Sequence, residues 1–131
     1  MIIDTSALLA VILNEEDEEQ MLTAMIDAPT LRISTANWVE AAIIIDARRN
    51  PAATMRFDDV IAELRLEIVP VSAQIASRAR RAYVNYGKGY HPARLNFGDC
   101  FSYALAKEYG EPLLFKGSDF SETDIQPALK R

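Results

Sequence analysis

Four acidic side chains stand out in this sequence because the residues around them are mostly apolar or because they follow an apolar run. They are Asp4 after Met-Ile-Ile, Glu40 in NWVEAAIII, Asp99 as the only acid in LNFGDCFSYALA, and Asp119 in FKGSDF. A carboxylate in apolar surroundings is costly unless it is paired or bound to a metal ion. Each of these acids therefore requires a partner.

A divalent cation is a partner that all four acids could share. Like charges that converge within a few ångströms cannot all stay ionised without a counter-charge. The chain has one histidine, His91, and one cysteine, Cys100, so a metal ion held by a single chain has to be bound mainly through oxygen. An all-oxygen set suits Mg²⁺ or Mn²⁺, and such an ion supports hydrolysis of a phosphodiester.

Each acid also has a simpler interpretation. Asp99 could interact with the dipole of a helix in its first turn, worth about 0.3–1 kcal/mol, and Asp119 could be an ordinary turn aspartate. Glu40 could pair with a distant arginine such as Arg48 or Arg94. Asp4 is the hardest to explain in this way, because no basic residue lies near it in the sequence.

Strands and helices alternate in the pattern that must position these acids. Short apolar runs predict strands over Met1–Asp4, Leu31–Ser34, Glu67–Val71 and Pro112–Phe115. Helical spacing, caps and breakers predict helices over Ala7–Leu13, Glu15–Asp27, Trp38–Arg49, Ala52–Leu66, Ala73–Tyr86 and Cys100–Tyr109. Thr5 or Ser6 is expected to cap the first helix, Thr35 or Asn37 the third, and Ser72 the fifth. This alternation predicts an α/β fold with a parallel sheet covered on both faces.

The carboxyl edge of such a sheet is where sites usually form. Asp4 lies at that edge because it ends the first predicted strand. The turn after Phe115, which leads to Asp119, lies at the same edge. The predicted topology therefore brings two of the four acids towards one place.

Length and charge limit the class of protein. At 131 residues the chain is expected to form one domain, residues 1–131. The net charge of −5 argues against a nucleic-acid partner, but residues 78–94 carry five Arg or Lys and no acid, with three tyrosines interleaved. This stretch predicts contact with a polyanion, with Lys88 and Arg94 as candidates; alternatively, its arginines pair with acids elsewhere. No apolar run approaches the ~20 residues of a membrane span, so we expect a cytoplasmic protein that does not engage a membrane.

The motifs resemble those of a known family. IDTSALLA, Glu40 in NWVEAA, and the long stretch YGKGYHPARLNFGDCFSYALAKEYGEPLLFKGSDF are similar to PIN-domain ribonucleases of the VapC toxin type. The resemblance covers residues 1 to 125. It implies a three-layer α/β/α domain with a central, mainly parallel sheet of four to five strands. It also implies endonucleolytic cleavage of RNA with Mg²⁺ or Mn²⁺, inhibition by a cognate antitoxin polypeptide, and a homodimer.

The resemblance also implies roles for individual residues. Asp4 and Asp99 would be the principal metal ligands, Glu40 a third acid that acts on the metal or its water, and Asp119 the fourth acid. Thr5 and Ser6 occupy the place where a hydroxyl of the family supports the first aspartate.

Three other classes of protein are alternatives to a PIN-domain ribonuclease. An aspartyl-phosphate phosphatase needs a second acid two residues after the first, where this chain has Ser6. A phospho-receiver domain needs a phospho-accepting aspartate at the end of the third strand, where this chain has Val71-Ser72. A catalytically inactive PIN-like binding module is the third alternative, although all four acids are present.

Overall fold

Four short parallel strands form the centre of the computed structural model, which describes residues 1–130. They are β1 (Ile2–Ile3), β2 (Arg32–Ser34), β3 (Glu67–Val69) and β4 (Leu113–Leu114), in the spatial order β3-β2-β1-β4. Ile2 pairs with Arg32 on one side and with Leu113 on the other. All three pairings are parallel, which confirms the sheet predicted from the sequence.

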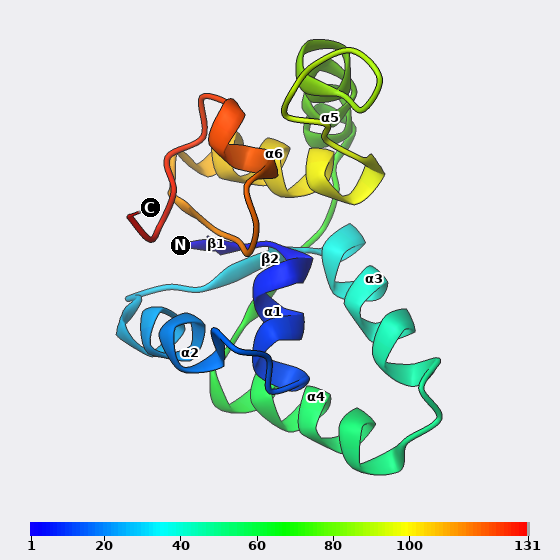
Figure 1. The fold of residues 1–131 in the computed structure, drawn as a ribbon, viewed down its shortest axis with the longest axis vertical. Coiled ribbons are helices and arrows are strands. Elements are labelled where there is room, and N and C mark those ends of the chain that lie inside the picture. Colours follow the sequence, from blue (N-terminus) through cyan, green and yellow to red (C-terminus); the bar gives the residue numbers. More distant parts are fainter. Residues whose placement is uncertain (131) are drawn as a thin grey trace.

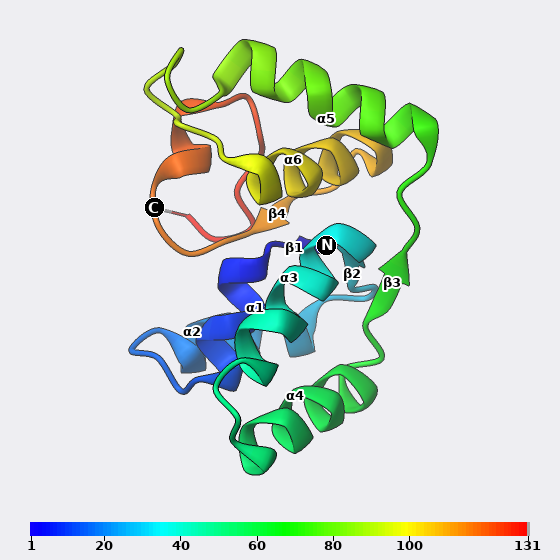
Figure 2. The ribbon, with the colours of Figure 1, turned by 90° about the vertical axis from the view of Figure 1, so that its right-hand side faces the viewer.

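Helices cover both faces of this sheet. In chain order they are α1 (Thr5–Ile12), α2 (Glu18–Asp27), α3 (Thr35–Asp46), α4 (Pro51–Glu63), α5 (Ala73–Tyr86) and α6 (Phe97–Tyr109). Figures 1 and 2 show α5 and α6 on one side of the sheet and α1 to α4 on the other. The result is the three-layer α/β/α arrangement that was expected.

The two halves of the core meet in strands only two residues long. Ile2 and Leu113 belong to the apolar cluster built with α5 and α6, whereas Ile3 and Leu114 belong to the cluster built with α1 to α4. Successive side chains of a strand point to opposite faces, so each pair serves both clusters. All four side chains are at most 1% exposed, which explains why such short strands are entirely apolar.

Several helix starts differ from the prediction. Asp4, not Thr5 or Ser6, is the N-cap of α1, and Ser34, not Thr35 or Asn37, is the N-cap of α3. In both cases the extended residue just before the helix, at or directly after the end of the strand, already provides the capping oxygen. α1 therefore begins two residues earlier than predicted, and α3 three residues earlier. Glu15 to Asp17 lie outside α2, because the backbone N–H of Glu15 bonds Ala10 and turns the chain.

α5 and α6, which form the other layer, end at the residues predicted from the sequence, Tyr86 and Tyr109. Ser72 caps α5 as predicted, through a hydrogen bond from the Ile75 N–H to its Oγ. α6 starts at Phe97, three residues earlier than predicted, because Asn96 and Asp99 form a capping box. Gly110 ends this helix in the left-handed conformation, at φ 63°.

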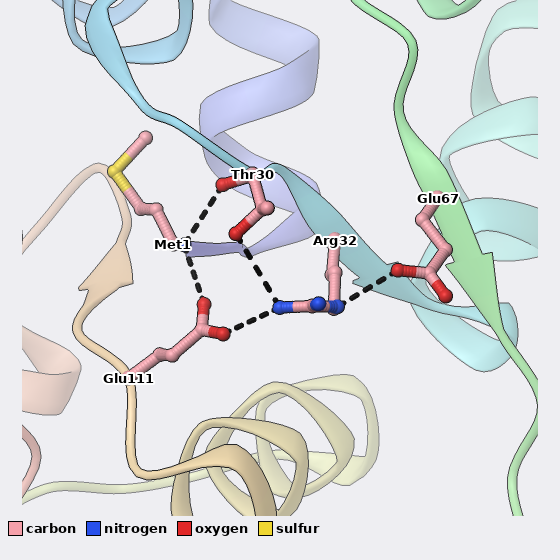
Figure 3. A network of polar contacts seen from close by, with 5 residues as sticks. All are labelled: Met1, Thr30, Arg32, Glu67 and Glu111. Atoms are coloured by element: carbon pink, nitrogen blue, oxygen red, sulfur yellow. Dashed lines mark hydrogen bonds and ion pairs between the residues drawn. The ribbon is translucent and has the colours of Figure 1, made fainter.

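A polar network closes the amino edge of the sheet, opposite the acids (Figure 3). The Met1 ammonium donates to the Thr30 carbonyl and to Glu111, while Arg32 donates to Glu111 and to Glu67. These contacts join β1, β2 and β3 to the segment after α6. Over residues 1–130, no helix is long and apolar enough to cross a bilayer.

Candidate active site

Asp4 lies immediately after β1 and is 4% exposed. Its Oδ2 accepts hydrogen bonds from the Ser6 N–H at 3.0 Å and from the Ser6 hydroxyl at 2.6 Å, and its Oδ1 accepts one from the Ser102 hydroxyl. The Lys116 N–H, just after β4, donates in turn to Ser6 Oγ at 3.0 Å. Ser6 therefore supports Asp4 directly, and three parts of the chain fix the orientation of this carboxylate.

Glu40 lies on α3 and is held by a residue that was expected to support Asp4. The Thr5 hydroxyl donates to Glu40 Oε1 at 2.6 Å, and it has no hydrogen bond to the Asp4 side chain among the described residues. The backbone of Gly98 lies against the same carboxylate: a Cβ atom at that position would be 2.7 Å from each Glu40 oxygen. Glu40 therefore sits between α1 and the first turn of α6.

Asp99 lies in that first turn and accepts a hydrogen bond from the Asn96 N–H at 3.1 Å. Its pKa is raised to about 7. Burial is the largest cause, followed by the negative charge of Asp4, while the Asn96 N–H opposes the shift. The charges of Asp119 and Glu40 raise the pKa of Asp99 further.

Asp119 opens a short 3-10 helix, η1 (Asp119–Glu122), and is exposed. Its negative charge contributes to the raised pKa of Asp99, so Asp4, Glu40 and Asp119 all lie near enough to Asp99 to act on it electrostatically. They come from the end of β1, from α3, from the start of α6 and from the segment after β4. The structure thus brings together residues separated by up to 115 positions, from Asp4 to Asp119.

Two supporting residues of this site were missed in the sequence. Ser102, on α6, is fully buried and donates to Asp4. Asn37, on α3, is fully buried and donates to Thr5 and to the Gly98 carbonyl. A spacing signal was available: each lies three residues from a site acid, Asp99 or Glu40, which places it on the same side of its helix.

The donor set suits a hard divalent cation. Among residues 1–130, no three His, Cys, Asp or Glu side chains form a group that could hold a metal ion by themselves. Mg²⁺, however, usually takes only one or two carboxylates and keeps several waters. After burial, the negative charges of Asp4, Asp119 and Glu40 raise the pKa of Asp99, and a cation would neutralise these charges. The thiol of Cys100 also lies near Asp99, but its pKa is raised to about 11, so it stays protonated at neutral pH and is a poor ligand. Asp4 with Asp99 therefore fits Mg²⁺ or Mn²⁺.

The basic stretch divides into two parts. Arg78 forms an ion pair with Glu108 at 2.8 Å, as the simpler interpretation expected. Lys88 and Arg80 instead line a groove of about 590 Å³ between α5 and α6, and neither has an ion pair in the described part of the chain. The groove is otherwise mainly apolar and aromatic; it is also lined by Ala76, Ala79, Tyr83, Asn96, Phe97, Cys100 and Phe101. Arg94 is exposed and likewise unpaired among residues 1–130.

A parallel α/β/α sandwich with Asp4 at the carboxyl edge of its sheet, and with three further acids whose charges interact around Asp99, defines the class of protein. The PIN-domain family model matches residues 1–126, and the chain belongs to this family. The chain is 44% identical over 132 residues to Ribonuclease VapC28 of Mycobacterium tuberculosis. This alignment covers 100% of the chain and 99% of that protein.

Solved structures with low sequence identity share the fold. The crystal structure of VapC20 of Mycobacterium tuberculosis, described as a sarcin-ricin loop cleaving toxin, gives a TM-score of 0.76 at 17% identity and covers 95% of each chain. The crystal structure of VapBC2 from Rickettsia felis bound to a promoter DNA fragment gives a TM-score of 0.76 at 15% identity, covering 96% of this chain and 94% of the other. These likenesses establish the PIN fold.

Proposed function

We propose that this protein is a metal-dependent endoribonuclease and the toxin of a VapBC toxin–antitoxin pair. The observation that carries the proposal is the convergence of the acids around the start of α6: Asp4 is hydrogen-bonded to Ser102 of this helix, and Glu40 lies against Gly98, the residue before Asp99. The charges of Asp4, Asp119 and Glu40 also raise the pKa of Asp99. The 44% identity to a named VapC ribonuclease over the full length supports the same assignment.

Asp4 and Asp99 would hold Mg²⁺ or Mn²⁺. When bound, such an ion polarises phosphoryl oxygens and lowers the pKa of water, which favours hydrolysis of a phosphodiester. Asp4 is prepared for this role by three hydrogen bonds that fix its oxygens. Asp99 is prepared by the capping box, which fixes its side chain on the helix start.

Glu40 would be a third acid that acts on the metal or its water, and Asp119 would be the fourth acid of the cluster. Glu40 is fixed by Thr5 and Gly98 beside the start of α6, so its carboxylate can orient a water molecule or accept its proton. Asp119 is exposed at the start of η1, and its negative charge acts on Asp99.

RNA would contact the basic side chains of this chain that form no ion pair among residues 1–130. Lys88 and Arg94 carry no ion pair within residues 1–130, unlike Arg78, and are therefore free to contact phosphates. The partners that we propose are RNA, a cognate antitoxin polypeptide and a second copy of the chain in a homodimer, with residues 1–131 acting as one domain. The structural likeness to a VapBC complex supports the antitoxin partner.

Cleavage of RNA by the purified chain tests the proposal. We expect cleavage with Mg²⁺ or Mn²⁺ that is abolished by a chelator and by Asp4→Asn or Asp99→Asn. Asp46→Asn is the matched control, because Asp46 lies at the far end of α3, where it accepts a hydrogen bond from Thr54. Undiminished cleavage in both site variants would overturn the assignment. Absence of cleavage with every divalent ion, in a protein that still binds its antitoxin, would support the inactive-module alternative.

A further inference from the structure

Asn37 occupies an unusual position beside the acids, because its side chain is polar and yet fully buried. Its Nδ2 donates to the Gly98 carbonyl at 2.9 Å and to Thr5 Oγ1 at 3.2 Å. Its Oδ1 has no hydrogen-bond donor within residues 1–130. An unsatisfied buried acceptor destabilises a fold, so the presence of an amide here calls for a role other than packing.

The contacts give this side chain a single orientation. The Gly98 carbonyl can only accept, so the atom facing it must be the donor Nδ2 and not Oδ1. Both Nδ2 protons are then in use, one towards Gly98 and one towards Thr5. The exchange of amide oxygen and nitrogen would place two acceptors in contact.

The orientation of Asn37 sets the direction of the next hydrogen bond. Because Thr5 Oγ1 accepts from Asn37, its own proton is available to donate. Two acceptors lie within reach, Glu40 Oε1 at 2.6 Å and the backbone carbonyl oxygen of Asn37 at 3.2 Å. The shorter contact is to the carboxylate, and hydrogen bonds to an ionised acceptor are the stronger kind. The proton of Thr5 therefore points to Glu40.

We propose that Asn37, acting through Thr5, is a positioning residue that fixes the Glu40 carboxylate against the first turn of α6. The same amide that directs Thr5 also holds the Gly98 carbonyl, one residue before Asp99. Asn37 thus joins α1, α3 and α6 at the point where their acids converge. The catalytic consequence rests on the proposed function, whereas the effect on the acid cluster does not.

A double-mutant cycle on Thr5 and Glu40 tests the proposal. Thr5→Val keeps the shape of the side chain and removes the hydroxyl, and Glu40→Gln keeps the shape and removes the charge. The dissociation constant for Mn²⁺ is measured by calorimetry for the wild type, both single variants and the double variant, with kcat and KM for RNA measured where cleavage occurs. Loss of a supporting hydrogen bond of this kind typically costs 10–100-fold in metal affinity or activity.

We expect Thr5→Val to weaken Mn²⁺ binding about tenfold and to lower kcat about 10–100-fold with little change in KM. Thr5→Ser, which keeps the hydroxyl, should retain wild-type values to within about threefold. In the Glu40→Gln background, Thr5→Val should have no further effect on Mn²⁺ affinity, because the group it positions has lost its charge. An equal effect of Thr5→Val in both backgrounds would overturn the proposal.

Two further variants separate positioning from packing. Thr35→Val is the matched control, because it removes a hydroxyl that donates to the Val69 carbonyl at 2.7 Å, away from the acids. It should leave Mn²⁺ affinity and kcat unchanged. Asn37→Leu removes both amide donors and should reproduce Thr5→Val; if it does not fold, Asn37→Ala, which also removes both donors, is measured in its place. Wild-type Mn²⁺ affinity and kcat in a folded Asn37 variant would overturn the role of Asn37. Failure to cleave RNA while the cycle shows coupling would reject the proposed function and keep the positioning role. Failure of the wild type to bind Mn²⁺ would reject both.

Discussion

The hydroxyl of Ser102 donates a hydrogen bond to Asp4 Oδ1 from a residue 98 positions further along the chain. This contact joins the carboxyl end of β1 to the middle of α6, the helix that carries Asp99 in its first turn. Ser102 is fully buried and Asp4 nearly so. This hydrogen bond therefore fixes Asp4 relative to α6, the helix that carries Asp99, the other proposed metal ligand.

Replacement of Ser102 by alanine should weaken both the fold and metal binding. The variant leaves Asp4 with one fewer donor, and a hydrogen bond to a charged group is worth about 1.5–3 kcal/mol. We expect the free energy of unfolding to fall by about this amount and Mn²⁺ affinity to fall at least about tenfold. Chemical denaturation and calorimetry measure the two effects.

Ser72→Ala is the control for this variant. Ser72 caps α5, so its loss should cost about 1 kcal/mol of stability. Mn²⁺ affinity should not change, because Ser72 has no contact with the acids among the described residues. A similar loss of affinity in both variants would show that Ser102 acts only through general stability.

Asp99→Asn should stabilise the protein without metal at alkaline pH. The pKa of Asp99 is about 7 in the fold against 3.8 for the ordinary group, so the folded state binds more protons than the unfolded state between these values. Stability therefore falls as pH rises from about 4 to about 7. Asparagine removes the charge and keeps an oxygen that can accept from the Asn96 N–H.

The gain in stability from Asp99→Asn should depend on pH. At pH 8 we expect a gain of about 1–2 kcal/mol, since partial exposure of Asp99 screens the full effect of the shift. Towards pH 3 the gain should disappear, because Asp99 of the wild type is then largely protonated in both the folded and the unfolded state. Denaturant titrations at several pH values measure it. A large loss of stability at pH 8 would show instead that the carboxylate of Asp99 is required for the helix start.

Mn²⁺ should stabilise the wild type more at pH 8 than at pH 5.5. Metal ligands must be deprotonated, and below pH 7 a proton on Asp99 competes with the ion. Each pH unit below 7 should cost up to about tenfold in affinity, and the rise in Tm at fixed Mn²⁺ should shrink accordingly. Asp99→Asn should show a smaller rise with no such pH dependence. An equal rise in both proteins at both pH values would place the ion elsewhere.

The sequence predicted the acids and the sheet better than it predicted their supports. Asp4, Glu40 and Asp99 were visible because a carboxylate in an apolar segment is costly, and the strands were visible as short apolar runs between helical patterns. Thr5 and Ser6 were adjacent to Asp4 in sequence, but only the packing of α3 beside α1 turns Thr5 towards Glu40. Asn37 and Ser102 act through contacts across 61 and 98 positions, which no local pattern specifies.

Removal of Lys88 and Arg94 should lower RNA affinity and its dependence on salt. Each phosphate contact that is lost reduces the slope of log affinity against log salt concentration by about 1. For Lys88→Gln with Arg94→Gln we expect a reduction of about 1–2, measured by fluorescence anisotropy with an inactive Asp4→Asn background. Arg78→Gln is the control from the same stretch, because its guanidinium is paired with Glu108. Similar slopes in all three proteins would remove this stretch from the RNA interface.

The effect of Gly98→Ala on the free energy of unfolding should depend in sign on the residue at position 40. In the wild type the new Cβ would lie 2.7 Å from both Glu40 oxygens, too close for either atom to remain in place. Alanine normally favours a helix over glycine by about 1 kcal/mol, but here displacement of a held carboxylate should make the variant about 1–3 kcal/mol less stable. In a Glu40→Ala background the clash is absent, so the same substitution should become neutral or stabilising by up to about 1 kcal/mol. Denaturation of the four proteins measures this reversal. Destabilisation of equal size in both backgrounds would mean that the backbone of α6, and not the carboxylate of Glu40, excludes a side chain at position 98.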